Sequence, residues 1–289
     1  MRTTRLASRL AFAPLLVLAL VACAPEDEKD SGSAAASSGS ACAPAQLKTL
    51  AAGKLTFGTD DPVYPPWFVD NKPDNGQGYE GAVALAVATK MGYTKDQIGW
   101  VRVPFNNAIQ PGPKTYDVDV NEFSITDERK QAVDFSAPYY DVTQAVIALK
   151  SSKIAGAKSL ADLKGAKLGA QVGTTSLRAI TESVKPTAQP QVYNNNDDAK
   201  KALQNGQIDG LVVDLPTAFY VTAVQVPNGK IVGQFAAKGN QERFGMVFQK
   251  GSPLVACVNN ALANMKATGV LKRIQQIWLA KVTGAPVLK

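Results

Sequence analysis

Short apolar runs rich in β-branched residues alternate with longer, helix-like stretches from residue 47 onward. We expect strands at 54–58, 100–104, 116–121, 143–150, 167–172 and 209–214, and a helix at 79–91. Strands that alternate with helices pack as sheets covered by helices. The pattern therefore predicts the α/β fold class.

A second, longer helix is predicted near the end of the chain. Ser252 is its expected cap, Pro253 occupies the first turn and Gly269 stops it. Apolar residues recur at helical spacing between these limits, at Leu254, Val258, Ala261, Leu262 and Met265. Cys257 flanks this apolar stripe, which places it beside the predicted core.

The first 22 residues have the pattern of an export signal peptide. Arg2, Arg5 and Arg9 precede an apolar stretch at 10–22 that is too short for a stable membrane span. Residues 20–23 resemble a bacterial lipobox, in which Cys23 would receive a diacylglycerol group and become the mature N-terminus. The alternative is a secretory signal that is cleaved after an alanine, with Cys23 incidental.

Residues 23–44 are expected to form a lipidated flexible tether. They are mostly Ala, Ser, Gly and charged residues without an aromatic side chain, so they bury too little apolar surface to fold. The lipid would hold the protein at the outer face of a membrane, where disulfides persist. With Cys23 acylated, Cys42 and Cys257 are the only free pair, and we expect them to form a disulfide.

Composition excludes several classes of site. The 289 residues include no histidine, which rules out Ser-His-Asp and Cys-His catalytic sets and histidine-bound zinc, and three cysteines cannot form a four-thiolate zinc site. The net charge of +7 falls to +4 without Arg2, Arg5 and Arg9, and no Lys/Arg block typical of nucleic-acid-binding tails occurs. We therefore expect no metal, no cofactor and no nucleic-acid partner.

A first candidate binding segment lies at 124–129. It follows a predicted strand, has Thr126 as an expected helix cap and places Arg129 three positions later. A cation at the start of a helix opposes the helix dipole, which indicates a missing anion that the guanidinium could bind with two hydrogen bonds. An exposed arginine in a loose surface ion pair is the alternative.

Two further candidate segments lie at the ends of predicted strands. After the strand at 167–172, Thr174 and Thr175 begin a helix, where hydroxyls and free backbone N–H groups suit a carboxylate or phosphate or simply cap the helix. Asp214 ends the strand at 209–214, at the sheet edge where α/β proteins bind ligands; it could hold an ammonium group or cap the next helix. A chain with both an anion-binding group and a cation-binding group suggests a zwitterionic ligand.

Together with other segments, these motifs resemble solute-binding family 3, the polar amino-acid-binding proteins of ABC importers. The likeness covers nearly everything from residue 55 to residue 279. Singly each motif is weak, but as an ordered set they are highly specific. The matching segments are 58–61, 64–67, 78–80, 124–129, 133–136, 138–140, 160–165, 173–175 and 209–214.

The resemblance implies a two-lobed periplasmic-binding-protein-like fold of type II, in which two crossing strands join lobes that close over a ligand. Lobe 1 would comprise residues 45–141 and 245–289, and lobe 2 residues 142–244. Arg129 would then bind the ligand α-carboxylate beside Ser124, and Thr175 would add donors from the other lobe.

The same resemblance implies roles for three more residues. Asp214 would take the ligand α-ammonium. Tyr64 and Phe105 would form aromatic walls around the ligand side chain, although Phe105 could instead belong to the core.

The sequence also departs from the family pattern. The segment 60–64 is one residue longer than usual, which leaves open whether Asp60 or Asp61 faces the cleft, and 110–115 replaces a more ordinary turn. Asn121 and Glu122 stand where small residues are frequent. Because Glu122 lies two residues before Ser124, both side chains of an extended segment would face the cleft. The two acids, Glu122 and either Asp60 or Asp61, favour a ligand with a cationic or amide side chain, unless Glu122 pairs with a lysine or arginine of the protein itself.

The resemblance therefore predicts a binding protein rather than an enzyme. It would be lipid-anchored at the extracellular face of the cell membrane, capture an amino acid and pass it to an ABC permease; we expect a monomer. One alternative is a dehydratase-like enzyme on the same scaffold, with Glu122 or Asp61 as general acid or base. The extracellular sensor of a signalling receptor is a third possibility.

Overall fold

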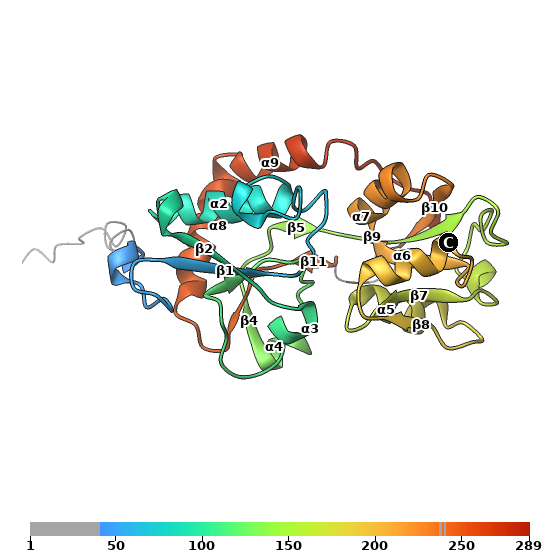
Figure 1. The fold of residues 1–289 in the computed structure, drawn as a ribbon, viewed down its shortest axis with the longest axis horizontal. Helices are drawn as coiled ribbons and strands as arrows, with labels where there is room; N and C mark the ends of the chain where they lie inside the picture. The colour runs from blue at the N-terminus through green and yellow to red at the C-terminus, as the bar shows by residue number, and fades with distance from the viewer. Residues whose placement is uncertain (1–40, 237–238, 240) are drawn as a thin grey trace, which may run out of the picture. The chain divides into compact units, whose positions relative to one another are not determined.

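The computed structural model describes residues 41–236, 239 and 241–289. The expected signal peptide, Cys23 and the tether up to residue 40 lie outside these residues. The described part of the chain forms two lobes, each built on its own β-sheet (Figure 1). This is the α/β arrangement that the alternating pattern predicts.

The first lobe contains a five-stranded sheet in which β1 pairs in parallel with β2 and β3, while β12 runs antiparallel between β3 and β4. The strands are, in spatial order, β2 (Ile98–Arg102), β1 (Leu55–Thr59), β3 (Val118–Asp119), β12 (Val247–Gln249) and β4 (Val133–Phe135). Its helices are α2 (Tyr79–Lys90), α3 (Phe105–Ala108), α4 (Arg129–Ala132), α8 (Leu254–Ala267) and α9 (Val270–Trp278), with short 3₁₀ turns η1 (Pro44–Gln46), η2 (Pro73–Asn75) and η3 (Lys95–Gln97).

The second lobe contains a six-stranded sheet, with β6 antiparallel to its neighbours β10 and β9, and β7 parallel to β8 and β9. The strands are, in spatial order, β13 (Val287–Leu288), β10 (Gly229–Phe235), β6 (Gln144–Leu149), β9 (Gly210–Asp214), β7 (Leu168–Gln171) and β8 (Gln191–Tyr193). Its helical segments are η4 (Ala161–Leu163), α5 (Thr175–Ala179) with η5 (Ile180–Val184), α6 (Asn196–Gln204), and α7 (Leu215–Tyr220) with η6 (Val221–Gln225).

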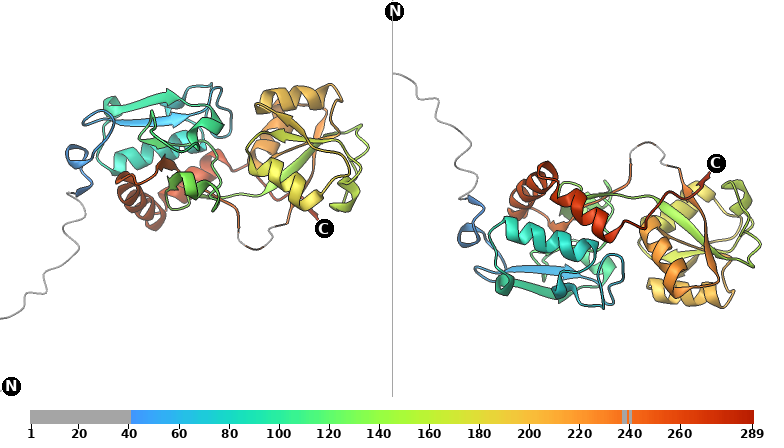
Figure 2. Two further views of the ribbon diagram at one scale, coloured as in Figure 1. Left: turned by 90° about the horizontal axis from the view of Figure 1, so that it is seen from below. Right: turned by 90° about the horizontal axis from the view of Figure 1, so that it is seen from above.

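Three chain segments run between the lobes. Two of them pair as the antiparallel strands β5 (Tyr140–Asp141) and β11 (Arg243–Phe244), which are labelled in Figure 1; Figure 2 shows from two further sides the chain that crosses between the lobes. The third follows α9 and ends in β13, which pairs with β10 of the second sheet. The predicted lobe boundary is therefore wrong at this end, because residues 287–288, which we assigned to lobe 1, complete the sheet of lobe 2.

Each sheet is covered on both faces by apolar side chains. In β6 the period-two alternation of a strand is visible directly: Val146 and Ala148 join one buried cluster, whereas Ala145 and Ile147 join another on the opposite face. In the first lobe, α2 and α8 pack against β1 in one cluster. Two well-filled layers on each sheet hold the strand ends, which carry the candidate binding residues, in a rigid frame.

Most of the expected elements are present. The strands predicted at 54–58, 143–150, 167–172 and 209–214 are β1, β6, β7 and β9, and the helix at 79–91 is α2. The apolar stripe of α8 is buried throughout, and Gly269 follows the helix with a left-handed φ of 73°. The predicted start of this helix is wrong by one residue: Pro253 rather than Ser252 is the N-cap, although the Ser252 hydroxyl accepts a hydrogen bond from the Leu254 N–H. The predicted Cys42–Cys257 disulfide is present, with a Cα–Cα distance of 5.5 Å.

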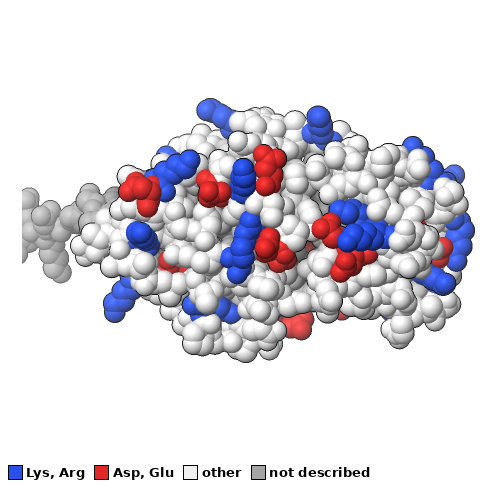
Figure 3. Space-filling model, viewed as in Figure 1, with Lys and Arg blue, Asp and Glu red and all other residues white. Residues whose placement is uncertain are grey.

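The surface carries charges of both signs. On the face seen in Figure 3, Lys and Arg side chains are interspersed with Asp and Glu rather than gathered in one field. Within the described residues, no helix combines the length and the apolar character needed to cross a membrane.

Candidate functional site

One cavity is lined by side chains from both lobes. Lobe 1 contributes Asp60, Pro62, Val63, Tyr64, Phe105, Asn121, Glu122 and Arg129. Lobe 2 contributes Gln171, Thr174, Thr175, Ser176, Asn196, Val213, Asp214 and Thr217. The cavity therefore brings together eight of the ten predicted ligand-binding residues, and the two that do not line it are Asp61 and Ser124.

Arg129, the first residue of α4, lies on the lobe 1 side of this cavity and is only 7% exposed. Its guanidinium donates to the Ser124 carbonyl at 2.7 Å and, across the cleft, to the Gly173 carbonyl at 3.0 Å. The guanidinium carbon lies 5.4 Å from the centre of the Phe105 ring. Burial, with the nearby Arg178 charge, lowers the pKa of Arg129 to about 10, so it stays charged at neutral pH. Since a guanidinium has five N–H donors, some remain for an anion.

The threonines of lobe 2 lie at the start of α5. The Thr174 hydroxyl accepts from the Leu177 N–H at 3.1 Å, which confirms the predicted capping role. The Thr175 hydroxyl lies 3.3 Å from the Ser124 hydroxyl of lobe 1. The end of β7 therefore presents hydroxyl groups to the Arg129 side of the cavity.

Asp214 ends β9 on the lobe 2 side. Its side chain does not cap α7; instead Oδ1 accepts a hydrogen bond from Gln144 Nε2 at 2.6 Å. Burial raises the pKa of this carboxyl well above its ordinary value, and the charge of nearby Glu242 raises it further. A buried carboxylate held by a single neutral amide is under-compensated and would gain from a cationic partner.

Aromatic rings line the cavity on the lobe 1 side. Phe105 stacks on the core residue Phe123 with 4.6 Å between ring centres, so it faces the cavity and packs on the core at once. The Tyr64 ring has the ammonium of Lys200 5.5 Å from its centre, and Lys200 in turn pairs with Asp197 at 2.6 Å. Both predicted wall residues therefore lie where a ligand side chain could contact them.

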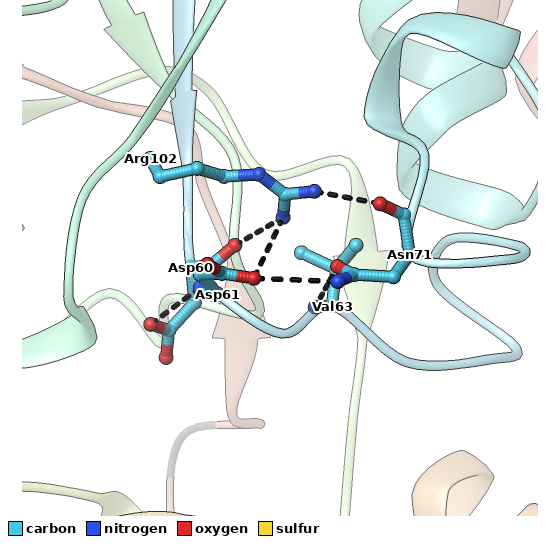
Figure 4. Close-up of polar contacts among 5 residues, drawn as sticks. All are labelled: Asp60, Asp61, Val63, Asn71 and Arg102. Carbon is cyan, nitrogen blue, oxygen red and sulfur yellow. Dashed lines mark hydrogen bonds and ion pairs between the residues drawn. The ribbon is translucent and has the colours of Figure 1, made fainter.

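The two adjacent aspartates of the 60–64 segment have different surroundings (Figure 4). Asp60 lines the cavity, and burial raises the pKa of its carboxyl. Asp61 has a side chain that is 62% exposed and lies 3.9 Å from Arg102, which also donates to the carbonyls of Asp60 and Asn71 at 2.6 Å. Asp60 is thus the acid that faces the cleft, and Asp61 is a surface residue.

Glu122 lines the cavity from a strained backbone position, with a left-handed φ of 54°. Its N–H donates to Glu80 at 2.7 Å, and its carboxylate accepts from the Thr217 hydroxyl of lobe 2 at 3.2 Å. The Trp67 indole donates to that same hydroxyl at 2.8 Å. Burial, then the charges of Glu80 and Asp214, raise the pKa of Glu122 well above its ordinary value.

The partner of Glu122 is therefore a hydroxyl. Among the described residues it makes no ion pair with a lysine or arginine, which was the alternative considered from sequence. The contacts from Trp67 and Glu122 to Thr217 join the two lobes beside the cavity.

The sequence prediction missed several residues of the cavity and its rim. Those lining the cavity are Asn121, Gln171, Ser176, Asn196 and Thr217; Gln144 and Glu242 lie directly behind it. Gln171 ends β7, so the rule that α/β sheets bind ligands at strand ends could have identified it. Gln144 and Glu242 meet only through folding, since 98 residues separate them.

Acidic groups predominate in the cavity. Asp60, Glu122 and Asp214 line it together with the single guanidinium of Arg129. In the described part of the chain, no group of three or more acidic, histidine or cysteine side chains is arranged to hold a metal ion. Opposite charges on opposite walls suit a small zwitterion, and the extra carboxyls suit a ligand with a further hydrogen-bond donor or cation.

Comparison with known proteins agrees with this geometry. The chain is 30% identical over 235 residues to the L-arginine-binding protein of Pseudomonas aeruginosa, covering 76% of this chain and 88% of that protein. It is 31% identical over 258 residues to the ABC transporter glutamine-binding protein of Bacillus subtilis, covering 84% of this chain and 89% of that protein.

A solved structure is similar as well. An ancestral arginine-binding protein bound to arginine superposes with a TM-score of 0.65 at 33% identity, covering 78% of this chain and 97% of that one. Residues 55–281 match the family described as bacterial extracellular solute-binding proteins, family 3. The chain belongs to this family and has its two-lobed, type II periplasmic-binding-protein fold.

Proposed function

We propose that the protein is the substrate-binding protein of an ABC amino-acid importer and that it binds a polar amino acid between its lobes. The observation that carries this proposal is that Arg129 and Asp214, from opposite lobes, line the same cavity. Arg129 would hold the α-carboxylate with the hydroxyl of Thr175, and Asp214 the α-ammonium. The names of its arginine- and glutamine-binding relatives support the ligand class.

A ligand with a cationic or amide side chain is favoured. Once Asp214 is assigned to the ammonium, Asp60 and Glu122 remain to face the side chain. An acidic side chain would bring a third negative charge into a cavity whose carboxyls are already costly to ionise.

Thermal-shift screening of the purified protein against the common amino acids tests this proposal, because a ligand that binds only the folded state raises its stability. Titration calorimetry would then rank the ligands. We expect arginine, lysine, histidine or glutamine to bind most tightly, with no chemical change of the ligand after prolonged incubation. Glutamate or aspartate binding at least about tenfold more tightly than arginine, lysine and glutamine would contradict the ligand class; turnover would favour the dehydratase-like alternative.

We further propose that Cys23 anchors the protein to the outer face of the membrane through a lipid, and that the protein meets its permease there as a monomer. The lipobox-like segment at 20–23 supports the anchor. In cells, Cys23→Ser should move the protein from the membrane fraction to the soluble one. Membrane retention of that variant would contradict the anchor.

A further inference from the structure

Glu242 is a carboxylate that no role described so far uses. It lies immediately before β11, on the second segment that crosses between the lobes. Its Oε1 accepts from the Ser124 hydroxyl of lobe 1 at 2.6 Å. Both of its carboxylate oxygens lie 3.2 Å from Gln144 Nε2.

Gln144 links this carboxylate to the ligand site. It is the first residue of β6, directly after the other crossing segment, and is 4% exposed. Its Nε2 also donates to Asp214 at 2.6 Å, while its Oε1 accepts from the Ser176 hydroxyl at 2.6 Å. One neutral amide thus lies between two carboxylates, Asp214 and Glu242.

Two neighbouring carboxylates bridged by a neutral amide leave negative charge uncompensated. In addition to the larger effect of burial, the charge of Glu242 raises the pKa of Asp214. A primary ammonium beside Asp214 would relieve both, since it brings a positive charge and three donors. The charge of Arg129 lowers the pKa of Asp214 only in part, because burial and Glu242 still keep that pKa well above its ordinary value. The guanidinium itself donates to the Ser124 and Gly173 carbonyls rather than to either carboxylate.

We propose that Glu242 is a positioning residue for the ligand α-ammonium: its charge, held by Ser124 and Gln144, strengthens the attraction at Asp214 without contacting the ligand. This inference rests on the proposed function. A second negative charge near the ammonium should strengthen the binding of a ligand that has an α-ammonium and should hardly change the binding of one that lacks it.

The test compares L-arginine with its des-amino analogue, 5-guanidinopentanoate, and L-glutamine with glutaramate, by calorimetry on the purified protein. Glu242→Gln removes the charge but keeps an oxygen to accept from Ser124 and Gln144. We expect it to weaken binding of the amino acids about tenfold while changing that of the des-amino acids less than about twofold. The exposed Glu182→Gln, in the same lobe, is the matched control and should change neither.

Glu242→Asp keeps the charge and supplies a second measurement. Its preference for an amino acid over the des-amino analogue should stay within about threefold of wild type, and a tenfold fall would overturn the proposal. Equal losses for both ligands in Glu242→Gln would show a structural role only, and no loss would also overturn the proposal. If the wild-type protein binds none of these amino acids, the proposed function fails first and this inference fails with it.

Discussion

Glu80, which lies beneath the site, allows a direct test of how burial changes the ionisation of a carboxyl group. It is fully buried in the first turn of α2, where Oε1 accepts from the Glu122 N–H at 2.7 Å and from the Tyr139 hydroxyl. Its Oε2 has no hydrogen-bond partner among the described residues. Burial outweighs these hydrogen bonds and raises the pKa of Glu80 from 4.5 to about 7.

This shift predicts how stability depends on pH. Because the folded-state pKa is the higher one, the contribution of Glu80 to the free energy of unfolding is fully present below pH 4.5 and is lost as pH rises through about 7. The size of the shift corresponds to about 3 kcal/mol. Glu80→Gln mimics the protonated acid and keeps an oxygen to accept from Glu122 and Tyr139, so it should not show this loss.

Urea unfolding followed by tryptophan fluorescence between pH 4 and pH 8 measures the effect. We expect the free energy of unfolding of Glu80→Gln, relative to wild type, to rise by about 3 kcal/mol from the acidic to the neutral end of this range. Other buried acids add to the slope of both proteins, so the difference between them is the informative quantity. The exposed Glu182→Gln should run parallel to wild type. Parallel curves for Glu80→Gln would refute the reasoning.

Three further predictions concern other parts of the molecule. Replacing both Cys42 and Cys257 with serine should lower the free energy of unfolding by up to about 5 kcal/mol, because the bond closes a loop with a sequence separation of 215; a loss below about 1 kcal/mol would contradict this. Asp60→Asn should reduce the preference for arginine over glutamine about tenfold in calorimetry, whereas Asp61→Asn, at the exposed position beside Arg102, should change it less than about twofold. Thr217→Val removes the lobe 2 hydroxyl that contacts Trp67 and Glu122 of lobe 1, so it should weaken binding of every amino acid by a similar factor of about ten; a loss confined to one ligand class would count against a role in holding the lobes together.

The strands and the main helices could be predicted because their signals are local. In β6, β7 and β9 the apolar runs bound the strands to within a residue or two, and the stripe of α8 is buried as its spacing indicates. The two-residue strand β13 gives no such signal. Its place in the second sheet depends on pairing with β10, which the sequence near the end of the chain does not encode.

The candidate site divides in the same way. The helix-dipole and strand-end rules, together with the family resemblance, predict that Arg129 and Asp214 bind the ligand, and in the structure both line one cavity. The choice between Asp60 and Asp61 depends on tertiary structure: Asp61 is exposed and lies 3.9 Å from Arg102, 41 residues further along the chain, whereas Asp60 lines the cavity. Ser124 was expected beside the ligand carboxylate, yet its hydroxyl donates to Glu242. That contact joins distant segments and has no local pattern.

The affinity of Arg129→Ala for the amino acid that wild type binds most tightly tests the central claim most directly. A buried guanidinium that holds the ligand carboxylate should cost about 2 to 5 kcal/mol of binding when it is removed, at least a thirtyfold loss by calorimetry. Arg129→Lys keeps the charge without the planar pair of donors, so its affinity should lie between those of wild type and Arg129→Ala. This second variant guards against a folding defect in the alanine variant. If folded Arg129→Ala binds within about threefold of wild type, Arg129 does not hold the ligand and the proposed site is wrong.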